Sequence, residues 1–263
     1  GSQYINKYEA SNNQAGGGTT FNHQSGKLRV DNGWFHIGRR GDSTYISSGN
    51  SELVADDRIS MSEAANNHVS HAHVELWNNA VLRTRRNATS LDAADAFGNS
   101  GSESFIGGAG GANATVNFTM NDNSIAESQH WRIAHRTGGV STLTLNHAAQ
   151  FRNRNNGQIS LGREGTGIMV ANDFSQIMLM GGGGGSLRVG DNNNGVGNLT
   201  MNQSAKVVGV NGTGHHVVIG DDGTGKGTVT MNDNSGFLRV RNVWIGNGGL
   251  SQGTVVMRNN SYI

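Results

Sequence analysis

Arginines recur in pairs, two residues apart, at three places in this 263-residue sequence. Residues two apart on a β-strand point to the same face, so the guanidinium groups of each pair would lie side by side. Guanidinium groups bind carboxylates and sulfates through paired hydrogen bonds, which suits a sulfated or carboxylated glycan. The candidate ligand-binding residues are therefore Arg83, Arg85, Arg152, Arg154, Arg239 and Arg241.

Acidic residues interrupt the same stretches of the chain. Asp56 and Glu127 stand where a continuous basic stripe would need cations. Such alternation also predicts an exposed face of ion pairs, which contribute little to stability. The sequence leaves open whether the arginines bind a ligand or form ion pairs with acidic residues of the same chain.

Three histidines, His68, His71 and His73, lie close together in the sequence, with Glu63 and Glu75 nearby. On a strand, His71 and His73 would present both imidazoles on one face, where Zn²⁺ or Ni²⁺ would accept them. Because no further ligand follows at a fixed spacing, these are weak metal candidates. We expect no bound metal and no cofactor.

Catalysis would need paired carboxylates, or a base beside a cation, held on one face. The nearest such group is Asp56, Asp57 and Glu63, with Arg58 and the three histidines, and no spacing fixes these residues together. Asp191 and Asp221 open glycine-rich turns whose oxygens would suit Ca²⁺, although neither turn has the spacing of an EF-hand loop. We assign no catalytic residue, and the sequence favours a non-catalytic protein without excluding an enzyme.

Repeated segments must position all of these residues. The segment Thr228–Phe237, T-V-T-M-N-D-N-S-G-F, returns in variant form along the whole chain. Its alternation predicts a strand with Val229 and Met231 facing inward and the threonines facing outward. A segment that returns this often indicates a repeat architecture rather than a site.

Aligning the copies on the apolar residue before the asparagine predicts one inward residue in each coil. On this alignment Met169 falls on the outer face, beside Glu75 and Val256, where it interrupts the outward threonines. The predicted inward column is Phe21, Ile46, Leu76, Met120, Leu145, Val170, Met201, Met231 and Met257.

The asparagine that follows this column is the most regular polar feature of the sequence. In stacked coils, equivalent asparagine amides can bond from one rung to the next, as they do in stacked β-structures. We therefore expect a structural ladder made of Asn121, Asn146, Asn172, Asn202 and Asn232.

Composition agrees with a thin, elongated core. Apolar residues make up 34% of the chain, while glycine alone contributes 41 residues, which suits short strands separated by frequent turns. A second column, an apolar residue usually followed by glycine, and a short third strand complete each unit. The predicted fold is all-β, a right-handed parallel β-helix with about three short strands per coil and eight to nine coils.

We expect residues 1–18 to be a tag scar and lead-in, and residues 19–263 to be one β-helix domain. The spacing widens around 87–104, which predicts a loop insertion there. The last residues stop within a repeat, so the chain is expected to be a fragment of a larger protein.

Charge and residue usage exclude several classes of function. The formal net charge is +1, so no strong field marks a nucleic-acid-binding protein. No run of 18 apolar residues is present, so we expect no membrane insertion by this segment. Cysteine is absent, which excludes disulfides and cysteine-based metal sites.

The segments Ile219–Ser235, I-G-D-D-G-T-G-K-G-T-V-T-M-N-D-N-S, and Ile245–Ser261 resemble the repeats of autotransporter passenger domains. These are adhesin-like type V secreted proteins of Gram-negative bacteria, and the likeness extends over roughly 19–263. It implies a right-handed β-helix that is secreted or displayed at the outer membrane. It also implies cell adhesion, with a surface glycan or protein, or another copy of the chain, as partner.

We therefore expect a non-catalytic adhesin or rigid display scaffold that binds a glycan or protein through an outward face and protruding loops. The alternative is a carbohydrate-active β-helix, either a polysaccharide lyase or a tailspike-like depolymerase. A third possibility is an architectural module whose only partner is itself.

Overall fold

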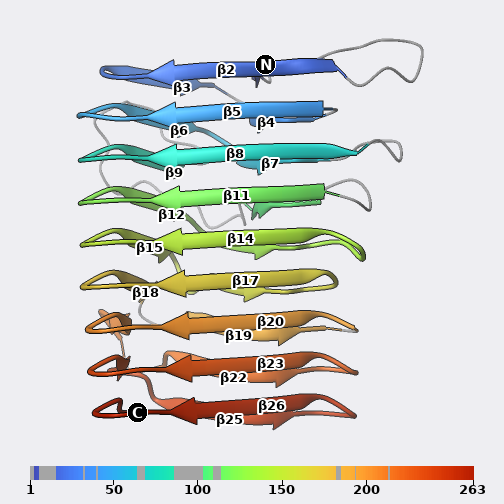
Figure 1. The fold of residues 1–263 in the computed structure, drawn as a ribbon, viewed down its shortest axis with the longest axis vertical. Coiled ribbons are helices and arrows are strands. Elements are labelled where there is room, and N and C mark those ends of the chain that lie inside the picture. The colour runs from blue at the N-terminus through green and yellow to red at the C-terminus, as the bar shows by residue number, and fades with distance from the viewer. Residues whose placement is uncertain are drawn as a thin grey trace.

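The computed structural model describes residues 3–5, 16–31, 33–39, 41–63, 69–85, 103–108, 114–181, 185–192, 194–212 and 214–263. Over these ranges the chain forms strands and turns and contains no helix, so none is present that could cross a membrane. All strand pairs are parallel and the strands stack into three sheets (Figure 1). The predicted all-β parallel β-helix with three strands per coil is confirmed.

Every third strand along the chain belongs to the same sheet. Sheet A contains β1 (Gln3–Ile5), β4 (Trp34–Ile37), β7 (Arg58–Met61), β10 (Glu103–Ile106), β13 (His130–Ile133), β16 (Gln158–Leu161), β19 (Ser186–Asp191), β22 (His216–Asp221) and β25 (Asn242–Asn247). Sheet B contains β2 (Gly16–His23), β5 (Gly41–Ser47), β8 (Ser70–Leu76), β11 (Ala114–Met120), β14 (Val140–Leu145), β17 (Thr166–Ala171), β20 (Val196–Met201), β23 (Lys226–Met231) and β26 (Gln252–Met257). Sheet C contains β3 (Lys27–Val30), β6 (Glu52–Ala55), β9 (Val81–Thr84), β12 (Ile125–Ser128), β15 (Gln150–Asn153), β18 (Gln176–Met180), β21 (Lys206–Val210) and β24 (Gly236–Leu238).

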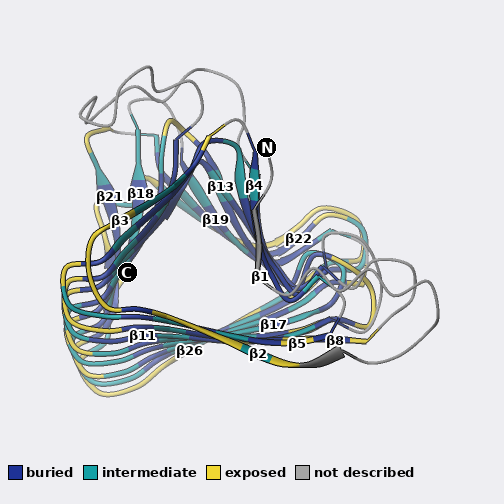
Figure 2. Cartoon of the chain, turned by 90° about the horizontal axis from the view of Figure 1, so that it is seen from above, coloured by how far each residue is buried: buried dark blue, intermediate teal, exposed yellow. Residues whose placement is uncertain are grey.

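The chain passes through the sheets in the constant order A, B, C. Among the described residues this triplet occurs eight times from β1 to β24, and β25 and β26 begin a further coil. Seen from the N-terminal end, the path runs clockwise as it moves away from the viewer (Figures 1 and 2). The solenoid is therefore right-handed.

The core lies between the three sheet walls, and exposed residues gather at the corners (Figure 2). Alternate residues of each strand point inward and stack on their equivalents in the next coil. In sheet B, for example, Leu145 and Met231 are fully buried, while Thr144 and Thr230 on the same strands are only half-buried. Burial of a few apolar side chains per strand is enough because neighbouring coils cover one another.

The corner between sheets B and C explains why N-D-N-S returns along the chain. The second residue of this four-residue turn has a positive φ, between 56° and 59° in seven coils from Asn78 to Asn259. Asparagine and aspartate adopt this left-handed conformation more readily than other side chains. The fourth residue is small and buried, as Ser124 and Ala149 are, because it fills the inner angle of the corner.

The end of each sheet A strand has a similar requirement. Gly190 has a φ of 71°, and a Cβ atom there would lie 2.2 Å from the carbonyl oxygen of Lys226 in the next coil. At Gly162, Gly190 and Gly220 the next coil passes too close for a side chain, whereas Ser62 and Ala134 adopt the positive φ at the same point of their coils.

The predicted inward column is wrong in the first two coils. Leu76 pairs with Ser47, not with Ile46, and Ser47 pairs with His23, not with Phe21. Ser47 and His23 are buried polar residues that make hydrogen bonds inside the solenoid. An alignment of the repeats on apolar residues therefore assigns the wrong residue in both coils.

The alignment also fails at β17. Ala171, not Val170, pairs with Leu145 of the neighbouring coil. Met169 is consequently buried in the core rather than outward, and Ile168 and Val170 occupy the outer face. A shift of one residue exchanges the two faces of a strand.

Two predicted boundaries lie partly outside the described residues. Of the loop insertion at 87–104, residues 87–102 are not described, and Glu103 and Ser104 belong to β10. Within the lead-in 1–18, β1 already pairs with β4 and β2 begins at Gly16.

Candidate binding faces

The asparagines of the B–C corner bond to one another along the solenoid. Each side-chain amide after the first, that of Asn121, donates to the side-chain carbonyl of the asparagine in the preceding coil, at 2.8–2.9 Å. Arg258 extends the row by donating to Asn232 at 3.3 Å. The amides are thus used within the protein. The members of this ladder are Asn121, Asn146, Asn172, Asn202 and Asn232.

The outer face of sheet C carries most of the arginines proposed from the sequence. Arg83 lies 2.9 Å from Glu52, and Arg152 and Arg154 lie 3.5 and 2.8 Å from the carboxylate of Glu127. Glu127 is only 2% exposed and stands in register between Arg83 and Arg152. Each of these three arginines therefore faces a carboxylate of its own chain.

The remaining arginines do not extend this group. Arg85 is itself buried, while Arg239 and Arg241 are exposed beyond the end of β24. Met178 and Val208 occupy the equivalent outward positions between the two groups. The register thus divides the arginines into an ion-paired cluster and a separate pair at the last coil.

The histidine candidates lie on sheet B as far as they are described. His68 is outside the described residues, and His71 and His73 are exposed on the outer face of β8. The Nε2 atom of His73 lies 2.7 Å from a carboxylate oxygen of Glu75. In the described part of the chain, no three potential metal ligands lie close enough to hold an ion.

The acidic candidates are not brought together. Asp56 pairs with Arg29 on sheet C, at 3.3 Å. Glu63 instead faces His36 at 2.8 Å and Arg39 at 3.3 Å, beside sheet A. Burial raises the pKa of Glu63, but the hydrogen bond and charge of His36 and the charge of Arg39 outweigh it, so the net pKa is lowered.

A different carboxylate pair lies beside sheet A, one coil apart. Asp191 and Asp221 are 5% and 2% exposed. Arg188 reaches both, at 3.5 and 2.6 Å, while Ser160 donates to Asp191 and Asn247 donates to Asp221. Burial raises the pKa of Asp221 above its ordinary value, and the hydrogen bond from Asn247 and the charge of Arg188 oppose that shift. The pair has general acid–base chemistry, but its oxygens already have protein partners.

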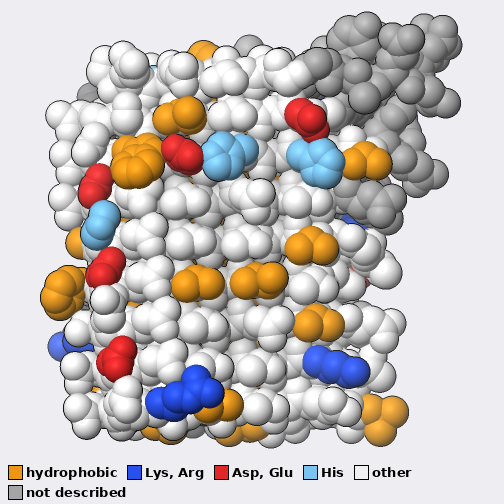
Figure 3. Space-filling model, viewed as in Figure 1, with side chains coloured by type: hydrophobic (Ala, Val, Ile, Leu, Met, Phe, Trp, Pro, Cys, Tyr) orange, Lys and Arg blue, Asp and Glu red, His pale blue; other side chains and the backbone are white. Residues whose placement is uncertain are grey.

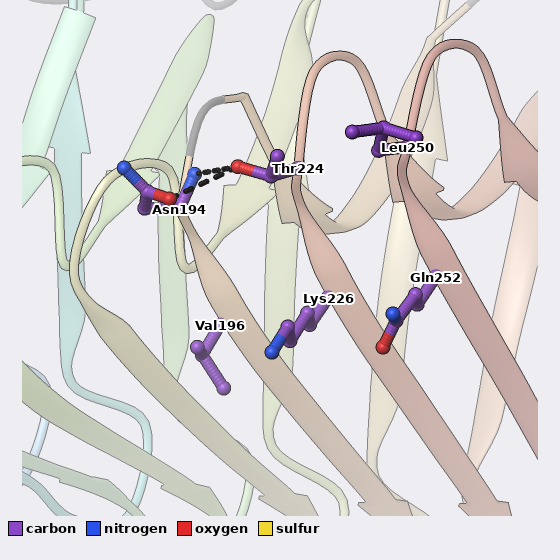
Figure 4. Close-up of a pocket in the computed structure, with 6 residues that line it drawn as sticks. All are labelled: Asn194, Val196, Thr224, Lys226, Leu250 and Gln252. Carbon is purple, nitrogen blue, oxygen red and sulfur yellow. Dashed lines mark hydrogen bonds between the residues drawn. The ribbon is translucent and has the colours of Figure 1, made fainter.

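An open hollow of about 520 Å³ crosses the last three coils of sheet B (Figure 4). Thr224 bonds both the backbone and the side chain of Asn194 at its rim, at 3.0 Å each. Its lining contains no carboxylate and no histidine, so it offers no acid–base pair. The lining residues are Asn194, Val196, Thr224, Lys226, Leu250 and Gln252.

The outer face of sheet B carries few charged side chains. Figure 3 shows this face, where most side chains are neither charged nor apolar. Threonine and asparagine recur there in register on β11 and β14 and again on β20 and β23, while Ile168 and Val170 of β17 lie between the two groups. These include Thr142 and Thr144 of β14, Asn198 and Thr200 of β20, and Thr228 and Thr230 of β23.

One row near the N-terminal end of the same face differs from the rest. His71, His73, Glu75 and Trp77 all point outward from β8 and the residue after it. Trp77 Nε1 donates to one oxygen of Glu75 at 2.8 Å, and the other oxygen lies 2.7 Å from His73. The alternation in S-H-A-H-V-E-L-W carries this signal, because each second residue is small or apolar and faces inward.

No protein-family model, curated protein or solved structure matches this chain.

Proposed function

We propose that the protein is a non-catalytic, rigid binding scaffold that presents the outer face of sheet B to a glycan or protein. The observation that carries this proposal is the contrast between the outer faces. Arg83, Arg152 and Arg154 on sheet C are engaged with carboxylates of the same chain, whereas the sheet B face offers uncharged hydroxyls, amides and an exposed polar row.

Parallel stacking gives this face a regular geometry. Successive strands lie about 4.8 Å apart, and outward residues two positions apart lie about 6.7 Å apart. A ligand with repeating units can therefore make the same weak contact several times, and the contacts add through effective concentration. The repeat resemblance supports display at a bacterial cell surface as the setting, with secretion and cell adhesion as part of the same proposal.

A pair of matched variants tests which face binds. The double substitution Thr144→Arg and Thr200→Arg places two bulky charges on sheet B, and the double substitution Gln176→Arg and Met178→Arg places two on the outer face of sheet C. Binding to an array of glycans and surface proteins should weaken at least about tenfold only for the sheet B variant. Loss of binding in the sheet C variant alone would contradict the proposal.

A carbohydrate-active enzyme is the second candidate, and the Asp191–Asp221 pair is the observation that favours it. Paired carboxylates are the groups that cleave glycosidic bonds. The test is incubation with neutral and acidic polysaccharides, followed by measurement of new reducing ends and unsaturated products. Turnover that disappears in Asp221→Asn would replace the binding proposal with this one.

Self-association distinguishes the third possibility, a purely architectural module. Sedimentation velocity should show a mass that depends on added ligand if the face binds an external partner. Oligomers that form alone and ignore every ligand on the array would support the architectural role instead.

A further inference from the structure

We infer that the outward row of β8 is a subsite for a neutral oligosaccharide, with Trp77 as its stacking platform and Glu75 as its hydrogen-bond acceptor. The inference rests on the proposed binding role of sheet B and names the ligand class and the residues. The row contains His71, His73, Glu75 and Trp77, while Ser70, Ala72, Val74 and Leu76 between them are buried.

The indole of Trp77 is held in place before any ligand arrives. Its Nε1 atom donates to Glu75 at 2.8 Å, and His73 contacts the other carboxylate oxygen at 2.7 Å. The side chain is nevertheless 39% exposed. Since its only polar atom is satisfied, the exposed part is apolar ring surface that is already ordered, which lowers the entropic cost of binding.

The surroundings of the row suit a ligand that has both apolar faces and hydroxyl groups. Thr44 and Asn117 lie in register on either side of His73, and Thr119 lies beside Glu75. A pyranose ring offers a C–H face to the indole and hydroxyl groups to the hydroxyl and amide groups around it. Each carboxylate oxygen of Glu75 already has one partner within the protein and has a second lone pair that can accept a bond from a sugar hydroxyl. Four outward positions extend over about 20 Å, so the row fits an oligosaccharide rather than a single sugar.

The charges around the row of β8 favour a neutral saccharide over an acidic one. Neither lysine nor arginine occurs on β5, β8 or β11, all of which are fully described. Asp122 adds a second carboxylate, bonded to the backbone N–H of Asn78, the residue after Trp77. The hydrogen bond from Trp77 lowers the pKa of Glu75, so this group is anionic at neutral pH and repels sulfated and uronic glycans.

The ring of Trp77 can be removed and compared with a matched control. Trp244 is 42% exposed on sheet A, where it stacks on His216, so Trp244→Ala removes an equally accessible indole from another face. The probes are cellohexaose, xylohexaose, mannohexaose, maltohexaose and chitohexaose, with heparin and polygalacturonate as acidic counterparts. Calorimetry and tryptophan fluorescence report binding, and circular dichroism reports folding.

The full chain should bind at least one neutral hexaose and neither acidic polymer. Trp77→Ala should weaken that binding at least about tenfold, Glu75→Gln should weaken it several-fold, and Trp244→Ala should leave it unchanged. Should Trp77→Ala fail to fold, Trp77→Phe keeps a ring but loses the bond to Glu75, and it should retain part of the affinity.

Two outcomes would overturn the inference. Undiminished binding in Trp77→Ala would remove the subsite, while the sheet B proposal would stand or fall on the Thr144→Arg and Thr200→Arg variant. Failure of the full chain to bind any neutral hexaose, or binding of the acidic polymers alone, would reject the ligand class. Neither result would by itself remove the role of the face for other partners.

Discussion

Asn202 accepts a hydrogen bond from the side-chain amide of Asn232 across 2.8 Å, from one coil to the next. The same bond links each earlier pair of the asparagine ladder, so every inner member both donates and accepts. Asn121, the first member, accepts through its carbonyl, while its amide nitrogen has no partner among the described residues.

Replacement of an inner ladder residue should therefore cost more than replacement of an exposed neighbour. Asn172→Ala removes two bonds and leaves a donor and an acceptor unpaired, so it should lower the free energy of unfolding by about 1–3 kcal/mol. Asn123→Ala, at an exposed turn position, should change it by less than about 0.5 kcal/mol. Urea unfolding measures both, and equal costs would show that the ladder does not stabilise the fold.

The left-handed turn residue offers a test of backbone strain. Asp233 has a φ of 58° and accepts a bond from Asn259. Asp233→Gly and Asp233→Val both remove that bond, so the difference between them isolates the backbone. Valine should be less stable than glycine by about 1–2 kcal/mol in thermal unfolding, because a β-branched residue disfavours this conformation. A valine variant as stable as the glycine variant would contradict this account of the turn.

Glu127 should be the most sensitive carboxylate on sheet C. Glu127→Gln leaves Arg152 and Arg154 without their anionic partner at a nearly buried position, at a cost of about 3 kcal/mol or more. The more accessible pair of Arg136 and Glu164, 3.9 Å apart, is the control, and Glu164→Gln should cost less than about 1 kcal/mol. Denaturant unfolding measures both losses of stability, and a larger loss for Glu164→Gln than for Glu127→Gln would contradict the prediction.

His135 should make stability depend on pH. Burial, followed by the charge of Arg163, lowers its pKa to about 4, below the ordinary value of 6.5. Because the unfolded chain binds the proton more readily, stability is fully present above about pH 6.5 and is lost as the pH falls toward 4. The loss should be on the order of 2 kcal/mol and should shrink in His135→Asn. An NMR titration that gives His135 an ordinary pKa would refute the prediction.

The fold could be predicted from the sequence because the patterns that indicate it lie within short segments. The alternation around Met231 predicts a strand, and the recurring asparagine predicts stacked corners. An alignment of the repeats on apolar residues gives the wrong register where the inward residue is polar or very small, as at Ser47 and Ala171. The alignment then selects the neighbouring outward residue.

The surface was harder to predict because its contacts join residues from different coils. Glu127 meets Arg152 only when the coil lengths between them are correct, so the sequence suggested a basic stripe where the structure has ion pairs. Asp191 and Asp221 come together for the same reason, across a coil boundary. The row from His71 to Trp77 could have been predicted, because it lies on one strand and needs only the period of two.

The constant order of the three sheets makes a single coil an interchangeable unit of length. Insertion of one more coil between β20 and β23 would lengthen the rod by about 4.8 Å and re-form the same corner, the same ladder bond and the same inward stack. Deletion of a coil would shorten it by the same step. The reach of the molecule can thus change by duplication or loss of whole coils without redesign of any contact within them.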